Sequence, residues 1–585
     1  MAPGQKRGGR STRSRSEAIE RYVSTGSSRA FVPIIIFVIF ALFLFARLFY
    51  LDVIVQDEYA RQAQNSHTVG LTVEPRRGTI YDRNGKILAI SVDATTVYCN
   101  PSEIKDPTAI AAAVASCLGG TYKDYVNALS AENASFAYVM RKADVARAQA
   151  LKELELPGIY FLDDTRRVYP YGQVGGQIVG GTNIEVDVEN NREYYVGISG
   201  LEYYYDETLS GSPGYYEAEI GANGTPIPGG VHEKTPAVDG TDIVISIDID
   251  FQKVVEDTLK SNLERMGVES GNAIVMDGAT GELYAIASTP YFNPADRSVV
   301  PEGSMSLKSI SNLLEPGSMF KTVSATCILE AGTMDVDDTL FCPAVITADE
   351  YEISDAHERE DTTYTFRQII EYSSNVGISL AVENMGFDKL YDCISRYNLH
   401  ELSGVDYPGE QLGYLVDFSH WSRVTGYNVA FGQGISMTPI QLIRFYGALI
   451  NNGVECTPHF LIKYPESGEV PVYQSERVIN RTEAISKMNS MLQTVVEEGT
   501  GVRAGIEGLN VAGKTSTAEI YDEENGGYKY NTYNLGFCGF ICDSNSKFVC
   551  YVGASDVIGD GVVTPIFHDI MSDAVIRYNI VSTAS

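Results

Sequence analysis

The stretch EPGSMFK, residues 315–321, places a serine three positions before a lysine, directly after a Pro-Gly break. The apolar run that follows predicts a helix that begins at Ser318 and continues through residues 319–332. Side chains three apart on a helix share one face, so Ser318 and Lys321 can meet. A serine hydroxyl needs an adjacent base to act as a nucleophile, and a lysine can be that base only when neutral. Alone this pattern is weak, because a serine at a helix start is most often only a cap.

Two further motifs strengthen the nucleophile hypothesis. EYSSNVGISLAVENMG, residues 371–386, carries Ser373 and Asn375 on a predicted loop that leads into a helix. NVAGKTSTAEI, residues 510–520, carries Lys514 in a strand-like run. Each has a plainer interpretation, as turn residues or as an exposed strand lysine. The ordered set S-x-x-K, S-x-N and K-T-x is, however, the signature of penicillin-binding proteins and serine β-lactamases.

The length and net charge of the chain limit the number of domains and the kinds of partner that we expect. The chain has 585 residues, with 44 basic and 76 acidic side chains and a net charge of −32. Length alone favours two or more domains, and the acidic balance argues against nucleic acid as a partner, because phosphates would be repelled. Residues 1–29 are an exception, with a local charge of +5.

An apolar run follows this basic tail. Residues 30–46, AFVPIIIFVIFALFLFA, carry no charge, and the run continues past Arg47 into LFYL. About 20 residues at ~1.5 Å rise cross a bilayer, and the run is apolar on every face, which favours a transmembrane anchor at 30–51 over a buried core helix. Without an A-x-A cleavage site directly after it, the anchor is expected to stay uncleaved. The positive-inside rule then predicts a single-pass cell-membrane protein with residues 1–29 cytoplasmic and the rest extracytoplasmic.

The cysteines and histidines suggest no metal site. Nine cysteines form no CxxC pair and seven histidines are scattered, so we expect neither a structural zinc ion nor a cofactor. An odd number of cysteines also argues against a full disulfide framework. Cys538 and Cys542 share strand parity, which predicts two core residues on one face of a strand.

The predicted domain organisation is a tail (1–29), an anchor (30–51), a pedestal or dimerisation domain (52–240) and a catalytic domain (241–585). The pedestal is expected to be mixed α+β. It should contain a hairpin at 74–92, turning at Asn84-Gly85, and helices over 124–156.

The catalytic region begins with a strand that passes into an amphipathic helix at 241–267, followed by a strand, turn and strand at 271–288. It ends with a strand at 547–556 and a helix at 565–580. Strands at both ends predict one antiparallel sheet covered by helices, an α+β domain with a second helical lobe.

With these motifs, the chain resembles a class B penicillin-binding protein, a membrane-anchored D,D-transpeptidase of peptidoglycan synthesis, of the division and sporulation branch. Three more segments carry the resemblance: RRGTIYDRNGKILA (76–89), GISGLEYYYDETLSG (197–211) and YNVAFGQGISMTPIQL (427–442). No glycosyltransferase region precedes the pedestal, as a bifunctional class A member would need. The likeness implies a penicillin-binding, serine β-lactamase-like catalytic fold.

The resemblance also implies roles for the motif residues. Ser318 would be acylated by the penultimate D-Ala carbonyl of a stem pentapeptide, with release of the terminal D-Ala. Lys321 would take the serine proton, and Ser373 would relay a proton to the leaving amine. Asn375 would hold the donor peptide's amide and Lys321, and Lys514 would add a positive field that keeps Lys321 neutral.

The third motif would bind substrate through Thr515, Ser516 and Thr517. Thr515 and Thr517 would hold the terminal carboxylate, and the backbone N–H groups of Ser318 and Thr517 would form the oxyanion hole. Ser516 departs from the family pattern, which has glycine there. Strand alternation places it on the face of Lys514, so we expect its hydroxymethyl group to project into space that glycine would leave to the substrate. The side chain is small, so we expect it to be tolerated. Obstruction of bulky β-lactams is favoured over the alternative, in which the hydroxyl hydrogen-bonds Lys514 or the bound carboxylate.

The implied partners are peptidoglycan stem peptides, β-lactams, a multi-spanning membrane glycosyltransferase contacted through residues 30–75, and other division or sporulation proteins. A D-Ala-D-Ala carboxypeptidase side activity is also compatible. Two alternatives stay open: a β-lactam hydrolase or sensor, and a non-catalytic scaffold. The long pedestal counts against the hydrolase, and the intact Ser318, Lys321, Ser373 and Asn375 count against the scaffold.

Overall fold

The computed structural model describes residues 14–54, 68–131, 134, 136–187, 192–220, 226–521, 526–559 and 561–583. Residues 1–13 of the predicted tail and 55–67 of the predicted pedestal lie outside the described residues. The chain divides into two compact units, Met1–Val73 with Pro213–Pro236, and Glu74–Ser212 with Ala237–Ser585.

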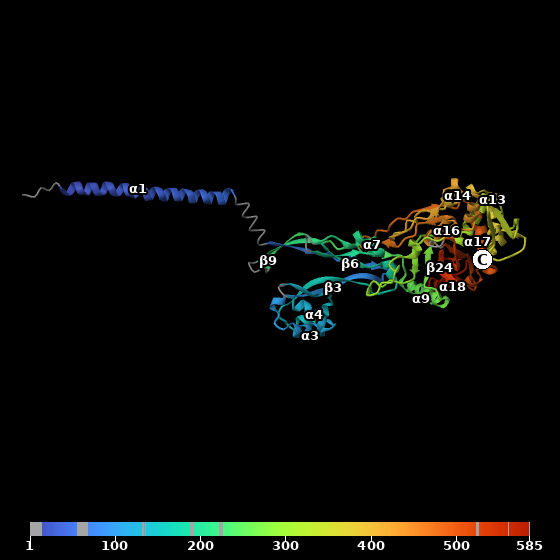
Figure 1. The fold of residues 1–585 in the computed structure, drawn as a ribbon, viewed down its shortest axis with the longest axis horizontal. Helices are drawn as coiled ribbons and strands as arrows, with labels where there is room; N and C mark the ends of the chain where they lie inside the picture. The colour runs from blue at the N-terminus through green and yellow to red at the C-terminus, as the bar shows by residue number, and fades with distance from the viewer. Residues whose placement is uncertain are drawn as a thin grey trace, which may run out of the picture. The chain divides into compact units, whose positions relative to one another are not determined.

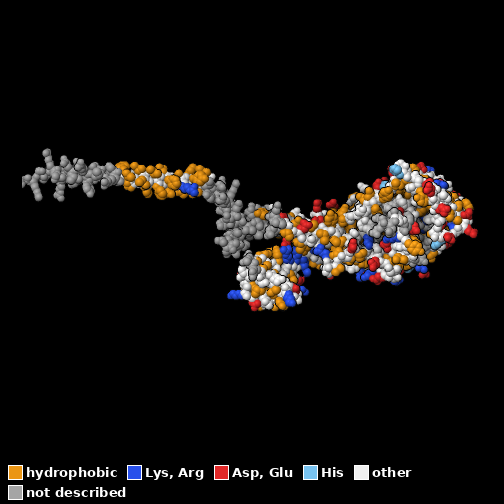
Figure 2. Space-filling model, viewed as in Figure 1, with side chains coloured by type: hydrophobic (Ala, Val, Ile, Leu, Met, Phe, Trp, Pro, Cys, Tyr) orange, Lys and Arg blue, Asp and Glu red, His pale blue; other side chains and the backbone are white. Residues whose placement is uncertain are grey.

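The first unit contains a long helix and a small sheet. Helix α1 (Ser14–Phe49) passes into a π-helical turn, η1 (Tyr50–Ile54). Its segment Phe31–Phe49 has a mean hydropathy of 2.7 and is long and apolar enough to cross a membrane. The apolar side chains of this segment are exposed in Figure 2. The sheet is antiparallel in the order β1 (Thr68–Val73), β8 (Gly214–Ile220), β9 (Pro226–Thr235).

The second unit begins with a mixed sheet that crosses the predicted domain boundary. Its strand order is β20 (Leu461–Lys463), β10 (Ile243–Ile245), β2 (Ile80–Tyr81), β3 (Ile87–Cys99) and β4 (Ala137–Ala143), with β5 (Ile159–Val168) also paired to β3. The predicted hairpin is confirmed, because β2 and β3 are antiparallel and Gly85 has φ +83° in the turn. Strand β20 lies beyond residue 241, so the sheet joins the two predicted domains.

Three helices cover one face of this sheet, as Figure 1 shows for α3 and α4. They are α3 (Pro107–Leu118), α4 (Tyr122–Leu129) and α5 (Val145–Lys152). The expectation of helices throughout 124–156 is wrong in its middle, where β4 pairs with β3. Residues 137–143 pair with residues 95–99 of β3, and this long-range pairing outweighs the local helical pattern.

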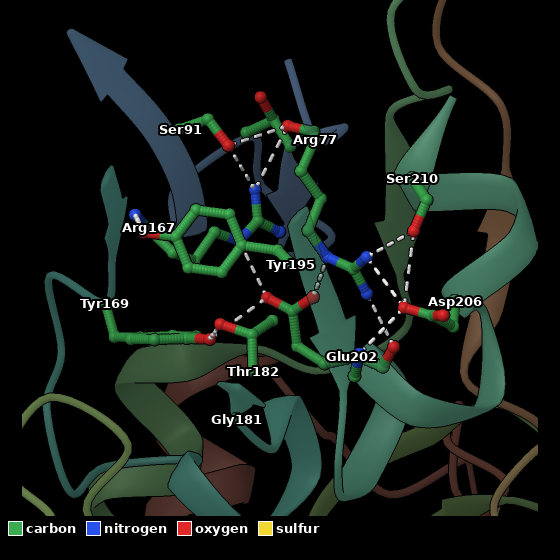
Figure 3. A network of polar contacts seen from close by, with 12 residues as sticks. Arg77, Ser91, Arg167, Tyr169, Gly181, Thr182, Tyr195, Glu202, Asp206 and Ser210 are labelled. Carbon is green, nitrogen blue, oxygen red and sulfur yellow. Dashed lines mark hydrogen bonds and ion pairs between the residues drawn. The ribbon is translucent and has the colours of Figure 1, made fainter. Parts of the chain in front are cut away.

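A buried ionic network ties the pedestal together (Figure 3). Glu202, which is fully buried, accepts hydrogen bonds from Arg77 Nε at 2.6 Å and from Arg167 Nε at 2.7 Å. Arg77 also pairs with Asp206 at 2.7 Å. Burial would raise the pKa of Glu202, but the two guanidinium groups hold it below its usual range. The remaining short elements of the pedestal are η2 (Pro101–Glu103), α6 (Gly176–Val179), β6 (Thr182–Asp187), β7 (Arg192–Gly197), α7 (Gly200–Tyr204) and α8 (Asp206–Ser210).

The catalytic region is built on one antiparallel five-stranded sheet, as predicted. The strand order is β12 (Leu283–Ser288), β11 (Ser270–Asp277), β24 (Phe548–Ile558), β23 (Tyr528–Cys542), β22 (Asn510–Tyr521). Successive side chains alternate between two cores; on β23, Phe537 enters one and Cys538 the other. Cys538 and Cys542 share a face and a core, which confirms that prediction.

Helices cover both faces of this sheet. Helices α9 (Ile249–Met266) and α18 (Thr564–Arg577) pack together beside β24 (Figure 1), and both form part of one core. The other core extends into the predicted helical lobe, which contains α11 (Lys321–Ala331), α12 (Phe366–Glu371), α13 (Asn375–Met385), α14 (Phe387–Arg396), α15 (Arg423–Ala430), α16 (Pro439–Ile450) and α17 (Thr482–Glu497).

Short elements complete the lobe. They are α10 (Lys308–Ser311), η3 (Gly317–Phe320), η4 (Phe418–His420), η5 (Val502–Ala504) and the strand pairs β13 (Thr339–Cys342) with β16 (Thr362–Thr365), β14 (Val345–Ala348) with β15 (Tyr351–Ser354), β17 (Tyr414–Leu415) with β18 (Ile435–Ser436), and β19 (Val454–Cys456) with β21 (Ser475–Arg477).

Candidate active site

Ser318 lies in a short 3₁₀ helix rather than in the α-helix itself. This helix, η3, leads directly into α11, which begins at Lys321. A 3₁₀ helix has three residues per turn, so side chains at i and i+3 eclipse each other. Lys321 Nζ accordingly lies 3.1 Å from Ser318 Oγ. The turn before the serine is hydrogen-bonded to a distant segment, because Gly317 N donates to the Gly432 carbonyl at 3.0 Å.

The second motif meets this pair. Ser373 Oγ lies 3.0 Å from Ser318 Oγ and 3.1 Å from Lys321 Nζ. Lys321 Nζ also donates to the Ser373 carbonyl at 2.5 Å and to Asn375 Oδ1 at 2.7 Å. Ser373 has φ +59°, a conformation that residues other than glycine seldom adopt and that often marks functional sites.

Asp355, which sequence reasoning missed, positions this second motif. Its carboxylate accepts hydrogen bonds from Ser374 Oγ at 2.9 and 3.0 Å and from Val376 N at 3.0 Å. Arg359 pairs with the same carboxylate at 2.6 Å. Asp355 therefore anchors the start of α13 beside Ser373. The sequence held no signal for it, because it lies on the loop that follows a short hairpin and outside any motif.

Lys514 lies on β22, and both motif lysines are fully buried. Burial lowers the pKa of Lys514 to about 7. Burial also lowers the pKa of Lys321 well below its usual value, and the nearby Lys514 cation lowers it further, against the opposing charge of Asp355. A buried lysine loses its proton more readily because the low-dielectric interior disfavours the charged form. Lys321 is thus poised to be a neutral base.

The two threonines lie on the other face of β22. Thr515 is half-buried and Thr517 is exposed, whereas Lys514 and Ser516 point inward. Thr515 Oγ1 lies 2.7 Å from Thr500 Oγ1, a contact from the 498–505 loop that the sequence did not reveal. The site therefore brings together the three motifs, with the threonines at an accessible edge.

The structure corrects the expectation for Ser516. Its side chain is 6% exposed, and its hydroxyl donates a 2.7 Å hydrogen bond to the Pro316 carbonyl. A side chain added at Gly317 would meet Ser516 Oγ at 2.6 Å and Ala518 Cβ at 3.2 Å, so the turn before Ser318 packs closely on this strand. The strand face was predicted correctly, but what packs on that face is the nucleophile's own turn. The hydroxymethyl group therefore does not project into open space.

This geometry defines a class of protein. A serine hydroxyl within hydrogen-bond reach of a deprotonatable lysine, with a second serine bridging both, is an activated nucleophile of the acyl-transfer type. Among the described residues, no cluster of three or more His, Cys, Asp or Glu side chains could hold a metal ion.

Comparison with known proteins places the chain in a family. The model of the penicillin-binding protein transpeptidase domain matches residues 271–572, more than half of the chain, and that of the penicillin-binding protein dimerisation domain matches residues 72–245. The chain therefore belongs to the penicillin-binding protein family, and its two domains are those of class B members.

Named relatives agree with this placement. Stage V sporulation protein D of Bacillus subtilis is 29% identical over 553 residues, covering 92% of this chain and 84% of the relative. Peptidoglycan D,D-transpeptidase FtsI of Escherichia coli K12 is 29% identical over 556 residues, covering 92% and 90%. Penicillin-binding protein 3 of Mycobacterium tuberculosis in complex with aztreonam superposes with a TM-score of 0.67 at 25% identity, covering 88% of this chain and all of that one.

Proposed function

We propose that this chain is a peptidoglycan D,D-transpeptidase that cross-links stem peptides through an acyl-enzyme on Ser318 and is inhibited by β-lactams. The observation that carries the assignment is the position of Lys321, which is fully buried, has a strongly lowered pKa and lies 3.1 Å from both Ser318 Oγ and Ser373 Oγ. The names of the relatives support the same reaction, since one is a peptidoglycan D,D-transpeptidase and another was solved with the β-lactam aztreonam.

Acylation begins with removal of the Ser318 proton by neutral Lys321. The serine oxygen then attacks the penultimate D-Ala carbonyl of a stem pentapeptide. The negative charge that develops on the carbonyl oxygen is stabilised by the backbone N–H groups of Ser318 and Thr517, a contribution of about 3–4 kcal/mol for a donor in comparable acyl transfers. The close packing of Gly317 on β22 keeps these two segments together.

The leaving D-Ala amine receives its proton through Ser373, which hydrogen-bonds both Ser318 and Lys321. Asn375 holds Lys321 through its Oδ1 atom, and its amide nitrogen donates to the Ser354 carbonyl at 3.0 Å, which fixes its orientation. An amine from a second stem peptide then attacks the ester, Lys321 accepts and returns the proton, and the cross-link forms. Attack by water instead would give the carboxypeptidase side activity.

Substrate recognition is assigned to the edge of β22. Thr515 and Thr517 are the hydroxyl donors for the terminal carboxylate, and protonated Lys514 supplies a positive field behind them. Ser516 acts indirectly here, because its hydroxyl bonds Pro316. The inferred division of the chain is the pedestal at 52–240 and the transpeptidase domain at 241–585.

Intact mass measurement after incubation with benzylpenicillin tests the nucleophile. One penicilloyl adduct is expected, and peptide mapping should place it on Ser318. It should be absent from Ser318→Ala and unchanged in Ser311→Ala, a matched serine change seven residues upstream. Slow loss of the adduct would separate a transpeptidase from a β-lactam hydrolase, which turns it over rapidly. An adduct on another residue would refute the assignment.

The proposed topology places residues 1–29 in the cytoplasm and the catalytic domain outside the membrane, with residues 30–51 as an uncleaved anchor. The apolar segment Phe31–Phe49 supports it, together with the basic residues that precede it. Protease added to intact protoplasts should digest the large domain and leave a small fragment that contains the tail and span. Complete protection would contradict this orientation.

A partner that polymerises glycan is also proposed, because the transpeptidase needs strands to cross-link. We assign this role to a multi-spanning membrane glycosyltransferase held through residues 30–75, within a division or sporulation assembly. Co-purification in detergent should survive deletion of residues 250–585 and fail when the span is exchanged for an unrelated one. The reverse pattern would refute the contact.

A further inference from the structure

A pair of cysteines lies behind the active site, where α11 and α14 pack together. Cys327 is on α11, nine residues after Ser318, and is fully buried; Cys393 is on α14 and is 9% exposed. Helices α11 and α14 are in contact, each of the two thiols shifts the pKa of the other, and both residues line one surface pocket of about 340 Å³. A molecule in that pocket would therefore meet the Cys393 thiol first, without entering the active site.

A cation stands beside one of the two thiols. Arg396 Nη2 donates to Cys393 Sγ at 3.3 Å and to Glu330 Oε2 at 2.6 Å. Glu330 is held in turn by Tyr397 OH at 2.6 Å and by Asn480 N at 2.7 Å, so it is a fixed anchor for the guanidinium. The other charged side chains that line the pocket are Lys389, Asp392 and Arg481. The pocket is thus lined by three cationic side chains and two carboxylates, and one of the cations, Arg396, contacts the Cys393 thiol.

This environment makes the two thiols unequal. Hydrogen bonding from Cys327 and from Arg396 lowers the pKa of Cys393 to about 7, against the opposing effect of burial. Burial raises the pKa of Cys327 well above its usual value. A thiolate is the nucleophile in thiol–disulfide exchange, and a neighbouring thiol can then displace the first product. Cys550 contrasts with Cys393, because Cys550 is fully buried and burial raises the pKa of its thiol.

We propose that Cys393 and Cys327 form a thiol–disulfide exchange site that accepts small disulfides from the pocket. The Cys393 thiolate attacks one sulfur of the small disulfide, RSSR, forming a mixed disulfide and releasing RS⁻, which carries away the electron pair of the broken bond. The Cys327 sulfur then attacks the Cys393 sulfur as its proton passes to the departing sulfur of the small thiol, which leaves as RSH, and a Cys327–Cys393 disulfide closes. In sum, two protein thiols are oxidised and one small disulfide is reduced to two thiols.

The two steps follow from where the groups lie. Cys393 borders the pocket beside Arg396, so the incoming disulfide reaches it first and the departing thiolate leaves next to a guanidinium. Cys327 is on the inner side, shielded from solvent and against Cys393, which suits the resolving role. The product disulfide would join α14 to the helix that begins next to the nucleophile.

The test uses the full-length protein and oxidised glutathione as the probe. Peptide mapping by mass spectrometry should find a Cys327–Cys393 disulfide in the parent. Cys327→Ser should instead accumulate glutathione on Cys393, and Cys393→Ser should leave Cys327 unmodified. The rate at which a thiol reagent labels Cys393 should level off above about pH 7. For an ordinary thiol, with a pKa of ~8.5, the labelling rate rises about tenfold per pH unit up to that pKa.

Cys117 is the internal control, since it is more exposed than Cys393 but lies on α3 in the pedestal. If exposure alone governs reactivity, Cys117 is modified first and Cys393 stays free, which would overturn the proposal. Modification of Cys327 in the Cys393→Ser variant would also overturn it. Before oxidation, both cysteine variants should be acylated by a fluorescent penicillin within about twofold of the parent rate, which would show that they fold. If either variant does not fold, the proposal is judged by whether the peptide map of the parent contains the Cys327–Cys393 disulfide.

Discussion

The pedestal and the active site each bury two cationic side chains, with opposite consequences. In the pedestal, Arg77 and Arg167 share the carboxylate of Glu202 (Figure 3). In the active site, the hydrogen bonds of Lys321 and Lys514 go to neutral oxygens of serine, asparagine and the backbone. The side chains of Arg77 and Arg167 are 3% and 1% exposed, and both lysines are fully buried.

The difference shows that the free-energy cost of burying a charge has two different outcomes in this protein. A buried charge is expensive unless it is paired, and a group that finds no partner loses its charge instead. The Glu202 carboxylate holds the pKa of Arg77 above its usual value in spite of burial, whereas the lysine pKa values fall. Pairing therefore stabilises the pedestal. In the part of the chain that the structure describes, no carboxylate forms an ion pair with Lys321 or Lys514, which favours a neutral base in the active site.

The largest effect is expected from Lys321→Arg, which places a permanent cation in the active site. A guanidinium cannot become neutral in a protein, so no base remains for Ser318. The second-order rate of acylation by benzylpenicillin should fall about a thousandfold or more, within the range of general-base contributions. Arg167→Lys is the reverse exchange in the pedestal and should change this rate by less than about twofold. Comparable rates in Lys321→Arg and the parent would show that Lys321 is not the base.

The next largest effect should come from Glu202→Gln, which removes the carboxylate that Arg77 and Arg167 share and leaves Arg77 its pair with Asp206. Removing one partner of a buried ion pair costs about 3–5 kcal/mol. Calorimetry should show a clearly lower unfolding temperature for the pedestal, while the folded fraction still acylates at the parent rate.

Asp93→Asn is the matched control, because Asp93 pairs with Arg76 on the exposed surface, where such pairs contribute about 0–1 kcal/mol. Its unfolding temperature should stay close to that of the parent. Equal shifts in Glu202→Gln and Asp93→Asn would mean that burial does not set the value of the pedestal network.

The pH dependence of acylation should reveal the charge of Lys514. With a pKa of about 7, Lys514 is a cation below that pH and neutral above it. If the cation keeps Lys321 neutral and attracts the carboxylate, the second-order acylation rate falls as the pH rises through about 7, by up to tenfold per unit. Lys514→Arg, which stays charged, should abolish this fall between pH 7 and 9 even if its absolute rate is lower. A parent rate that keeps rising to pH 9 would contradict this role.

The sequence predicted the parts of the fold and site that depend on local pattern. The hairpin at Gly85, the antiparallel sheet and the helix after the S-x-N motif follow from turn chemistry and periodicity. Strand β4 was missed because its pairing with β3 overrides the helical signal around it. Asp355 and Thr500 were missed because their contacts are made only when distant loops fold together. For Ser516, alternation gave the correct strand face but could not identify what packs against it.

The smallest effect concerns Ser516, which links the active-site strand to the turn before the nucleophile. Its hydroxyl donates to the Pro316 carbonyl in a buried setting, two residues from Ser318. Such a bond contributes about 1 kcal/mol, so Ser516→Ala and Ser516→Gly should both slow acylation by about fivefold if it positions the nucleophile. Ser555→Ala on β24 serves as the control and should leave the rate unchanged.

Two drugs of different size separate positioning from obstruction. Loss of a positioning bond slows a small penam and a bulky cephalosporin alike, because the defect lies in the nucleophile and not in the groove. Removal of an obstruction would instead make Ser516→Gly faster with the cephalosporin only. The 6% exposure of Ser516 favours positioning, since a side chain enclosed by the nucleophile's turn has little surface to offer a drug. A faster glycine variant with the bulky drug would show that this turn opens during acylation and that Ser516 then faces the substrate.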